Sequence, residues 1–232
     1  MIPVPAVEVA PAPRRDDALR QRLQARLDAF ERHTITLPGA RHAAVALAVV
    51  DEGHGADVDG MPRHAVPSDR PALLLTRRTE SLRAHAGQWA LPGGRIDEGE
   101  RAEQAALREL GEEVGLWLQA GALLGRLDDF ATRSGYVITP LVVWAGAGSA
   151  LQANPAEVHS VHRIAFAELL RADAPILEPP HAPGGAPVLK MPVGDRWIAA
   201  PTAAFLYQFR EVCLLDRATR VVHFDQPHFA WR

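Results

Sequence analysis

Apolar residues along this chain gather into short runs separated by polar turns, a pattern that indicates strands. Residues 43–50 (AAVALAVV) predict a buried strand, and residues 72–76 (ALLLT) predict the strand that returns beside it. Residues 51–70 between them are rich in Gly, Pro and Asp and predict a long hairpin loop. Residues 122–130 and 135–146 predict two more strands, the second with a run of β-branched residues.

The C-terminal part of the chain mixes strands and helices. Residues 157–166 predict a strand that leads into a short helix, FAELLRA. Residues 188–200 predict a hairpin around Gly194-Asp195, and residues 201–216 predict a helix that starts at a proline. Residues 172–186 predict an irregular loop, and the closing RVVHFDQPHFAWR predicts a short edge strand. Strands and helices thus alternate without βαβ regularity, which favours an α+β domain with a mixed sheet between helices.

An amphipathic helix is predicted near the N-terminus, over residues 15–32. Its apolar residues recur at helical spacing: Leu19, Leu23, Leu27 and Phe30. The pattern leaves open whether this helix caps the core of its own chain or joins two copies in a homodimer. We therefore expect an N-terminal extension over residues 1–34 and a single domain over residues 35–232.

Composition and charge narrow the class of protein. The chain has 232 residues, of which 47% are hydrophobic and 23% charged, as in a soluble globular domain. The net charge of −3, without a basic block, argues against a general nucleic-acid partner. The sequence contains no run of about eighteen apolar residues, so we expect no membrane span. The N-terminus lacks the pattern of a signal peptide. The single cysteine, Cys213, excludes an internal disulfide and fits a reducing cytoplasm, where we expect the protein.

A helix predicted over about residues 100–115 carries the candidate chemistry of the chain. Glu109, Glu112 and Glu113 lie at positions i, i+3 and i+4, so their side chains project from one face. Acidic residues on a helix are most often a solvated face. Three carboxylates this close repel one another, however. A divalent cation bound to them replaces this repulsion with attraction. Mg²⁺ suits such a site because it prefers carboxylate oxygens and shares substrate phosphates.

The residues around this acidic triplet follow the spacing G-x5-E-x7-R-E-U-x-E-E-x-G-U, with U an aliphatic residue, from Gly94 to Leu116. This spacing resembles the Nudix box, the signature of the Nudix hydrolases. The resemblance implies an α/β/α sandwich with the box as a loop-helix-loop at its edge. It also implies a hydrolase that cleaves a diphosphate between a nucleoside and another moiety, with Mg²⁺ or Mn²⁺ as cofactor. Glu100 and Arg108 resemble the ion pair that holds the loop of the box to its helix.

The same resemblance implies roles for the acidic side chains. Glu109 and Glu113 resemble metal ligands, and Glu112 resembles a third ligand or the general base. An acid outside the box often completes such sites, and Glu157 is the candidate here, although a surface position at the start of a strand explains it equally well. We expect Glu109, Glu112, Arg108 and Glu157 to form the catalytic set.

The segment before the box, LLTRRTESLRAHAGQWALPGG, resembles the signature of the coenzyme A pyrophosphatase branch, L-L-T-x-R-[SA]-x3-R-x3-G-x3-F-P-G-G. Thr79 and Leu91 depart from this signature, which has Ser or Ala at the first position and Phe at the second. The matching positions are Leu74, Leu75, Thr76, Arg78, Arg83, Gly87, Pro92, Gly93 and Gly94.

These matching residues suggest how a phosphorylated substrate would bind. Arg78 and Arg83 supply charged donors for phosphate oxygens, including the 3′-phosphate of coenzyme A. Gly93 and Gly94 let the backbone approach a ligand. The implied substrate is coenzyme A or an acyl thioester of it, cleaved to 3′,5′-ADP and (acyl-)4′-phosphopantetheine. Two alternatives stay open: hydrolysis of another small nucleotide, such as ADP-ribose or NADH, and a Nudix domain that senses a nucleotide without cleaving it.

Overall fold

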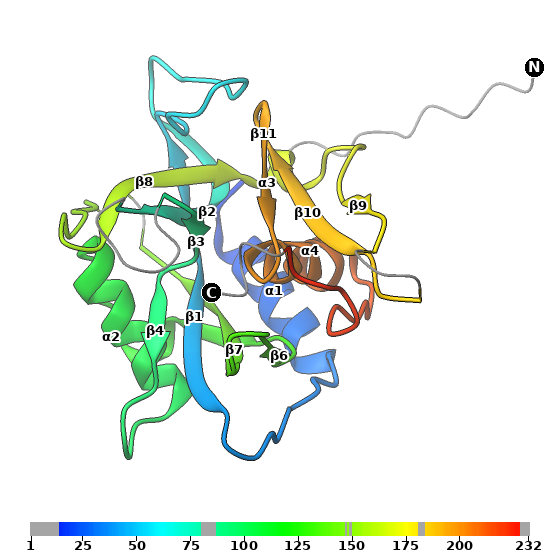
Figure 1. Cartoon of the computed structure of the whole chain (residues 1–232). Helices are drawn as coiled ribbons and strands as arrows, with labels where there is room; N and C mark the ends of the chain where they lie inside the picture. Colours follow the sequence, from blue (N-terminus) through cyan, green and yellow to red (C-terminus); the bar gives the residue numbers. More distant parts are fainter. Residues whose placement is uncertain (1–13, 80–86, 147, 149, 181–183, 228–232) are drawn as a thin grey trace, which may run out of the picture.

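The computed structural model describes residues 14–79, 87–146, 148, 150–180 and 184–227. Its centre is a mixed sheet (Figure 1), in which β1 and β7 run parallel while the remaining described pairs are antiparallel. The strands lie in the order β3 (Trp89–Ala90), β2 (Ser68–Arg78), β1 (Arg41–Gly53), β7 (Tyr136–Trp144) and β5 (Leu123–Arg126). Three further strands pair with this set: β4 (Gly93–Arg95) with β1, β6 (Phe130–Ala131) with β7, and β8 (Val158–Ala165) with β2.

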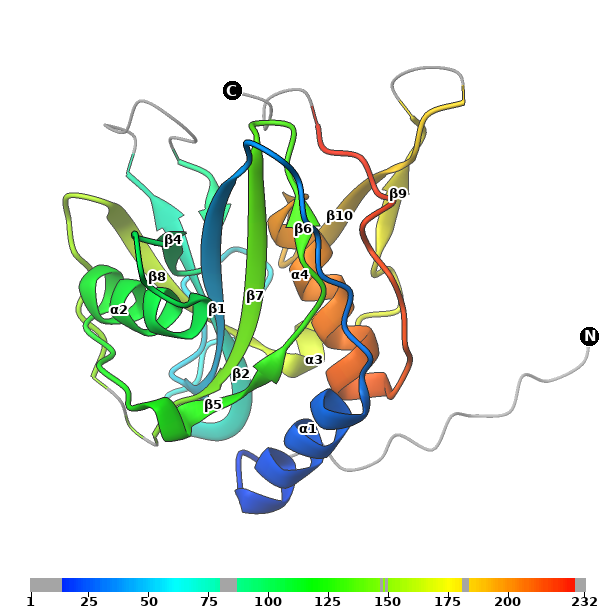
Figure 2. The same ribbon diagram turned by 90° about the horizontal axis from the view of Figure 1, so that it is seen from below.

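Helices cover both faces of this sheet. Helix α2 (Ala102–Val114) lies on one face, while α1 (Asp17–Ala29) and α4 (Thr202–Phe209) lie on the other (Figure 2). The central strand β1 is therefore buried on both sides, which explains its continuous apolar run. Its side chains alternate between the two cores, with alanines toward α2 and with Leu47 and Val49 toward the other layer. This layering confirms the predicted α+β sandwich.

Helix α1 caps the core of its own chain. It begins after Asp16, whose carboxylate accepts a hydrogen bond from the Leu19 amide at 2.8 Å. Its residues Leu19, Leu23 and Leu27 are buried in the same cluster as the α4 residues Phe205 and Phe209. The apolar face of this helix is thus covered within the chain.

The C-terminal part forms a smaller second sheet. Strand β8 leads into a short helix, α3 (Phe166–Leu169), as predicted. Strands β10 (Val188–Val193) and β11 (Arg196–Ala199) form the hairpin predicted around Gly194-Asp195. A π-helical turn, Arg210–Leu214, follows α4, and a 3₁₀ turn, Ala120–Ala122, precedes β5. No helix in the described ranges is both long and apolar enough to cross a membrane.

Three predicted segments differ from the structure. The single strand predicted over residues 122–130 breaks after β5, because the intervening Asp128 turns into the protein interior. The segment 172–186 contains β9 (Ile176–Glu178), which pairs with β10 and so depends on a partner distant in sequence. The predicted C-terminal edge strand is reduced, among the described residues, to one bridge between Val188 and Asp225.

Candidate active site

Helix α2, which carries the acidic triplet, has well-defined ends. At its start, the Arg101 amide donates to the Gln104 side chain at 3.0 Å, as in a capping box. At its end, Gly115 adopts the left-handed conformation with φ of 71°, which favours glycine. In mid-helix, the Trp117 ring lies where a side chain at Gly111 would project, so only glycine fits there. The predicted limits of this helix are confirmed.

Two glycines bring the backbone of β4 against the acidic helix. A Cβ atom at Gly94 would collide with the carboxylate of Glu109, so the glycine allows that carboxylate to lie directly on the strand. The Gly93 amide donates a hydrogen bond to Oε2 of Glu113 at 3.3 Å. Gly93 in turn packs against the β1 backbone at Ala44, where a side chain would also collide. Gly93 and Gly94 thus form the contact between the acidic helix and the sheet.

Glu113 is the most deeply buried of the three acids, with 3% of its surface exposed. Burial raises its pKa to about 8; the charge of Arg78 opposes this shift, and the charges of Glu109 and Glu157 add to it. Among the described residues, no Lys, Arg or His makes an ion pair with it, and its hydrogen bond comes from the Gly93 amide. It is therefore a buried carboxyl group surrounded mainly by like charge.

Arg108 donates hydrogen bonds to three carboxylates at once. Its Nε and Nη2 donate to the two carboxylate oxygens of Glu100, both at 3.0 Å, which confirms the predicted ion pair. Its Nη1 donates to Glu109 at 2.8 Å and to Glu112 at 3.0 Å, contacts that the spacing alone does not predict. The hydrogen bonds from Arg108 lower the pKa of Glu100, and its carboxylate partners, Glu100 first, raise the pKa of Arg108.

The acidic triplet is not gathered into a ready-made ligand set. Within the described ranges, no three His, Cys, Asp or Glu side chains converge as ligands of one metal ion would. The carboxylates of Glu109 and Glu112 instead bind Arg108. Burial also raises the pKa of Glu109, and the nearby charges of Glu112 and Glu157 add to this effect. Glu112, in contrast, is half exposed.

Glu157 lies near the acidic helix although it comes from the turn before β8. Its charge is close enough to raise the pKa values of both Glu109 and Glu113. Its backbone oxygen accepts a hydrogen bond from the Thr79 amide at 3.0 Å, which ties this turn to the end of β2. The Glu157 side chain is exposed.

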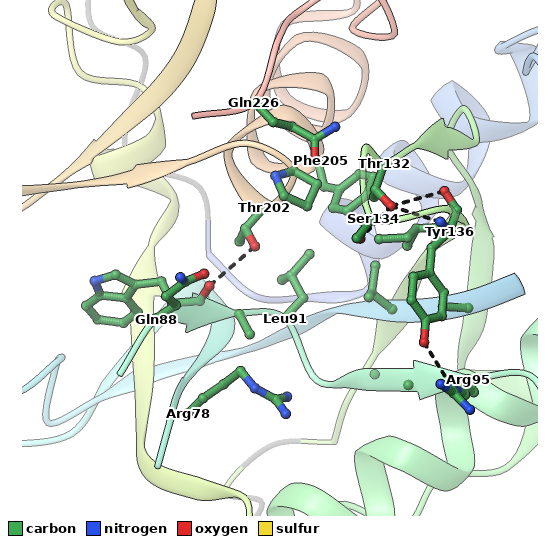
Figure 3. Close-up of a pocket in the computed structure, with 18 residues that line it drawn as sticks. Arg78, Gln88, Leu91, Arg95, Thr132, Ser134, Tyr136, Thr202, Phe205 and Gln226 are labelled. Atoms are coloured by element: carbon green, nitrogen blue, oxygen red, sulfur yellow. Dashed lines mark hydrogen bonds between the residues drawn. The ribbon is translucent and has the colours of Figure 1, made fainter. Parts of the chain in front are cut away.

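A pocket of about 290 Å³ adjoins the two glycines (Figure 3). Its walls come from the β3–β4 segment, the β6–β7 turn and the start of α4. Arg78 lines one end, and Leu91, which replaces the Phe of the signature, lies in the wall with 4% of its surface exposed. Arg83 lies outside the described residues. Thr132 and Ser134, in the link between β6 and β7, also line the pocket.

Several pocket residues are not found by sequence reasoning. They come from segments far apart in the chain and carry no common spacing: Trp89, Arg95, Tyr136, Thr202, Phe205 and Gln226. Arg95 occupies a variable position inside the box, next to Gly94. Only its position between two fixed residues of the box could have drawn attention to it.

Comparison with known proteins gives the following matches. The family profile described as NUDIX domain matches residues 63–190. Among curated proteins, an uncharacterized Nudix hydrolase NudL from Photorhabdus laumondii is 38% identical over 131 residues, which cover 56% of this chain and 62% of the relative. A protein of the same description from Yersinia enterocolitica is 40% identical over 102 residues, covering 44% of this chain and 52% of the relative. The chain therefore spans less than two thirds of the length of these relatives.

Solved structures with a similar chain path were also found. A MutT/nudix family protein from Enterococcus faecalis aligns with a TM-score of 0.44 and 17% identity, over 71% of this chain and 52% of that chain. A MutT protein from Methanosarcina mazei Go1 aligns with a TM-score of 0.41 and 22% identity, over 61% of this chain and 84% of that chain.

Proposed function

This chain belongs to the Nudix family, and from that membership we propose that it is a divalent-metal-dependent hydrolase that cleaves the diphosphate of coenzyme A or of its acyl thioesters. Its partner is then a small nucleotide, and its cofactor is Mg²⁺ or Mn²⁺. We assign the reaction to residues 35–232, with helix α1 packed against that domain, and to a reducing cytoplasm in which Cys213 remains a buried thiol.

The observation that carries the proposal is the carboxyl group of Glu113. It is buried beside Glu109 and against Gly93, which lines the pocket together with Gly94. No described residue forms an ion pair with the carboxyl group of Glu113. A buried acid without a matching cation is costly unless it serves binding or catalysis. A divalent ion bound here would match that charge, polarise the phosphate oxygens and acidify a bound water.

The residues of the chain then have separate roles in the reaction. Glu109 and Glu113 hold the metal, and Glu112 either completes the ligand set or takes the proton of the attacking water. Arg78, whose charge already acts on Glu113, binds the diphosphate beside the part of the pocket wall that Gly93 and Gly94 form. Water attacks one phosphorus, the bridging P–O bond breaks, and the leaving phosphate departs with the electron pair.

Two further residues have a supporting part in this proposal. Glu157 adds negative charge to the metal site from the turn before β8. Arg108 keeps Glu109 and Glu112 in place through the hydrogen bonds described above. Arg83 remains a proposed phosphate ligand on the basis of the signature alone.

The choice of coenzyme A rests on the segment from Leu74 to Gly94. It matches the branch signature in all but two positions, and it supplies Arg78, Gly93 and Gly94 to the pocket. One departure, Leu91, keeps an apolar side chain in the wall of the pocket. ADP-ribose and NADH remain the alternative substrates, since they also contain a diphosphate.

A substrate panel tests the proposal. Coenzyme A, dephospho-coenzyme A, ADP-ribose and NADH are incubated separately with the protein and Mg²⁺ or Mn²⁺, and the products are separated by chromatography. We expect release of 3′,5′-ADP from coenzyme A with the highest kcat/KM of the panel. Faster cleavage of ADP-ribose would overturn the choice of substrate but not of reaction. Binding without cleavage of any substrate, with either metal, would instead support the nucleotide sensor.

A further inference from the structure

Two arginines line the pocket at its two ends. Figure 3 shows Arg78 and Arg95 on either side, with Leu91 between them. Arg78 ends β2 and lies close enough to Glu113 to lower the pKa of that acid. Arg95 ends β4, on the far side of Gly94, and its side chain extends beside Tyr136. The pocket therefore offers positive charge at two separate places.

The position of Arg95 is fixed by Tyr136. Its Nε donates a hydrogen bond to the Tyr136 hydroxyl at 2.8 Å. The Tyr136 ring is itself held by Arg41, whose guanidinium carbon lies 4.0 Å from the ring centroid and whose Nη2 donates to the Ser134 carbonyl at 2.7 Å. Two guanidinium groups thus meet at one tyrosine on the rim of the pocket.

No acidic side chain in the part of the chain that the structure describes pairs with Arg95. Among the described residues it makes no ion pair, and its two terminal nitrogens donate no hydrogen bond. The contrast is with Arg108, which binds three carboxylates, and with Arg133, which binds both carboxylate oxygens of Asp225 at 2.8 and 2.9 Å. A guanidinium that is held through Nε and keeps both Nη groups available suits an anion with several oxygens, such as a phosphate monoester.

The space between the two arginines suits a nucleoside. Leu91, Ile138 and Phe205 supply apolar wall, while Thr132 and the ring of Tyr136 lie nearer Arg95. A ribose and base placed there would have the diphosphate at Arg78 and any substituent of the ribose directed toward the rim. A substrate with two separated phosphate groups therefore suits a pocket with positive charge at two places.

We propose that Arg95 is a specificity residue that binds a second phosphate of the substrate, the 3′-phosphate on the ribose of coenzyme A. Tyr136 is its positioning residue. This inference rests on the proposed function and deepens it, because it separates the 3′-phosphate at Arg95 from the diphosphate at Arg78. ADP-ribose and NADH carry no such phosphate and leave Arg95 without a partner.

Nucleotide binding tests this assignment without turnover. Dissociation constants of 3′,5′-ADP and of AMP, which differ by the 3′-phosphate alone, are measured by calorimetry on the wild type and on Arg95→Gln. We expect the wild type to bind 3′,5′-ADP roughly tenfold to a hundredfold more tightly than AMP. Arg95→Gln should bring this ratio close to one while changing the affinity for AMP by less than about twofold.

Two further variants serve as controls. Arg70→Gln removes an exposed arginine from the start of β2, outside the pocket, and should leave the ratio unchanged. Tyr136→Phe removes the hydroxyl that holds Arg95 and should lower the ratio by a smaller factor. An Arg95→Gln variant that keeps the wild-type ratio, or that loses affinity for both nucleotides equally, overturns the proposal.

The proposed function can fail independently. Suppose that the wild type binds 3′,5′-ADP more tightly than AMP, and that Arg95→Gln loses this preference, but that coenzyme A is not cleaved. That result would support the phosphate site and contradict the hydrolase proposal. If coenzyme A is cleaved but 3′,5′-ADP and AMP bind equally, the hydrolase proposal stands and the phosphate site falls.

Discussion

Two buried acidic residues of this protein differ in the hydrogen bonds and charges that surround them. Asp128, with 1% of its surface exposed, accepts hydrogen bonds from the His33 amide at 2.6 Å, from Gln208 at 2.7 Å and from Arg220 at 2.8 Å. Glu113, with 3% exposed, accepts a hydrogen bond of 3.3 Å from the Gly93 amide, the one such bond that the described residues give it, and lies near two other acids.

The difference separates a buried charge that several contacts stabilise from a buried carboxyl group with few such contacts among the described residues. A buried carboxylate with a cation and several donors can stabilise a fold, because the contacts offset the loss of water. Asp128 fits this description and joins three distant segments of the chain. Within the described ranges Glu113 lacks such contacts, and burial raises its pKa to about 8. We therefore expect substitutions at the two positions to affect different properties.

The largest effect is expected for Glu113→Gln on catalysis. The substitution removes the charge and keeps the volume, so the fold should persist while the metal loses a ligand. We expect kcat at saturating Mg²⁺ to fall by roughly a thousandfold, which corresponds to about 4 kcal/mol in the barrier. Glu98→Gln, an exposed acid in the turn before α2, is the matched control and should retain its activity. Near-wild-type turnover by Glu113→Gln would remove this residue from the metal site.

Asp128→Asn should show the reverse pattern. The free energy of unfolding, measured by urea denaturation, should fall by about 3 kcal/mol, because Arg220 loses its charged partner in a buried contact. The kcat of the folded protein should stay within about twofold of the wild type. Asp59→Asn, on an exposed loop, controls for the loss of one negative charge. A variant with normal stability but impaired turnover would show that the two acids do not differ as described.

Arg108→Lys should have an intermediate effect. A lysine ammonium cannot reproduce the planar arrangement that joins Glu100 to Glu109 and Glu112. We expect about tenfold lower kcat/KM and a higher Mg²⁺ concentration at half-maximal activity. Arg126→Lys, which alters a similar contact to Glu103 outside the acidic triplet, is the control. Identical metal dependence in Arg108→Lys and the wild type would show that Arg108 does not position the ligands.

The smallest effect concerns the stability of the metal-free protein as a function of pH. The pKa of Glu113 is raised from 4.5 to about 8 on folding, so the folded state binds its proton more tightly than the unfolded state. The resulting stabilisation is complete below about pH 4.5 and is lost as the pH rises to about 8. In EDTA, the Tm of the wild type should fall relative to that of Glu113→Gln as the pH rises across this range. Parallel Tm curves for the two proteins would show that burial does not perturb Glu113.

Local patterns allowed most of the fold to be predicted. The box helix could be placed because its capping residues and Gly115 act within one turn of its ends. The strands β1, β2 and β7 could be placed because burial on both faces leaves long apolar runs. The ion pair of Glu100 with Arg108 was also accessible, since both residues belong to one local motif.

Features that depend on distant partners could not be predicted in this way. Strand β9 forms only because β10 lies beside it, and the break after β5 follows from the contacts of Asp128 with residues that come at least eighty positions later in the chain. In the pocket, Tyr136 and Phe205 meet through packing of the whole domain. The unmatched environment of Glu113 likewise becomes visible only when the positions of Gly93, Arg78 and Glu157 are known.

Metal binding tests the role of Glu113 most directly. Mn²⁺ is titrated into the wild type and into Glu113→Gln at pH 7, with calorimetry in buffers of different ionisation enthalpy. Because the pKa of Glu113 is about 8 without metal, binding should release close to one proton from the wild type. Glu113→Gln should bind Mn²⁺ at least about tenfold more weakly and release no proton from this position. Equal affinity and equal proton release in the two proteins would contradict the assignment of Glu113 as a metal ligand.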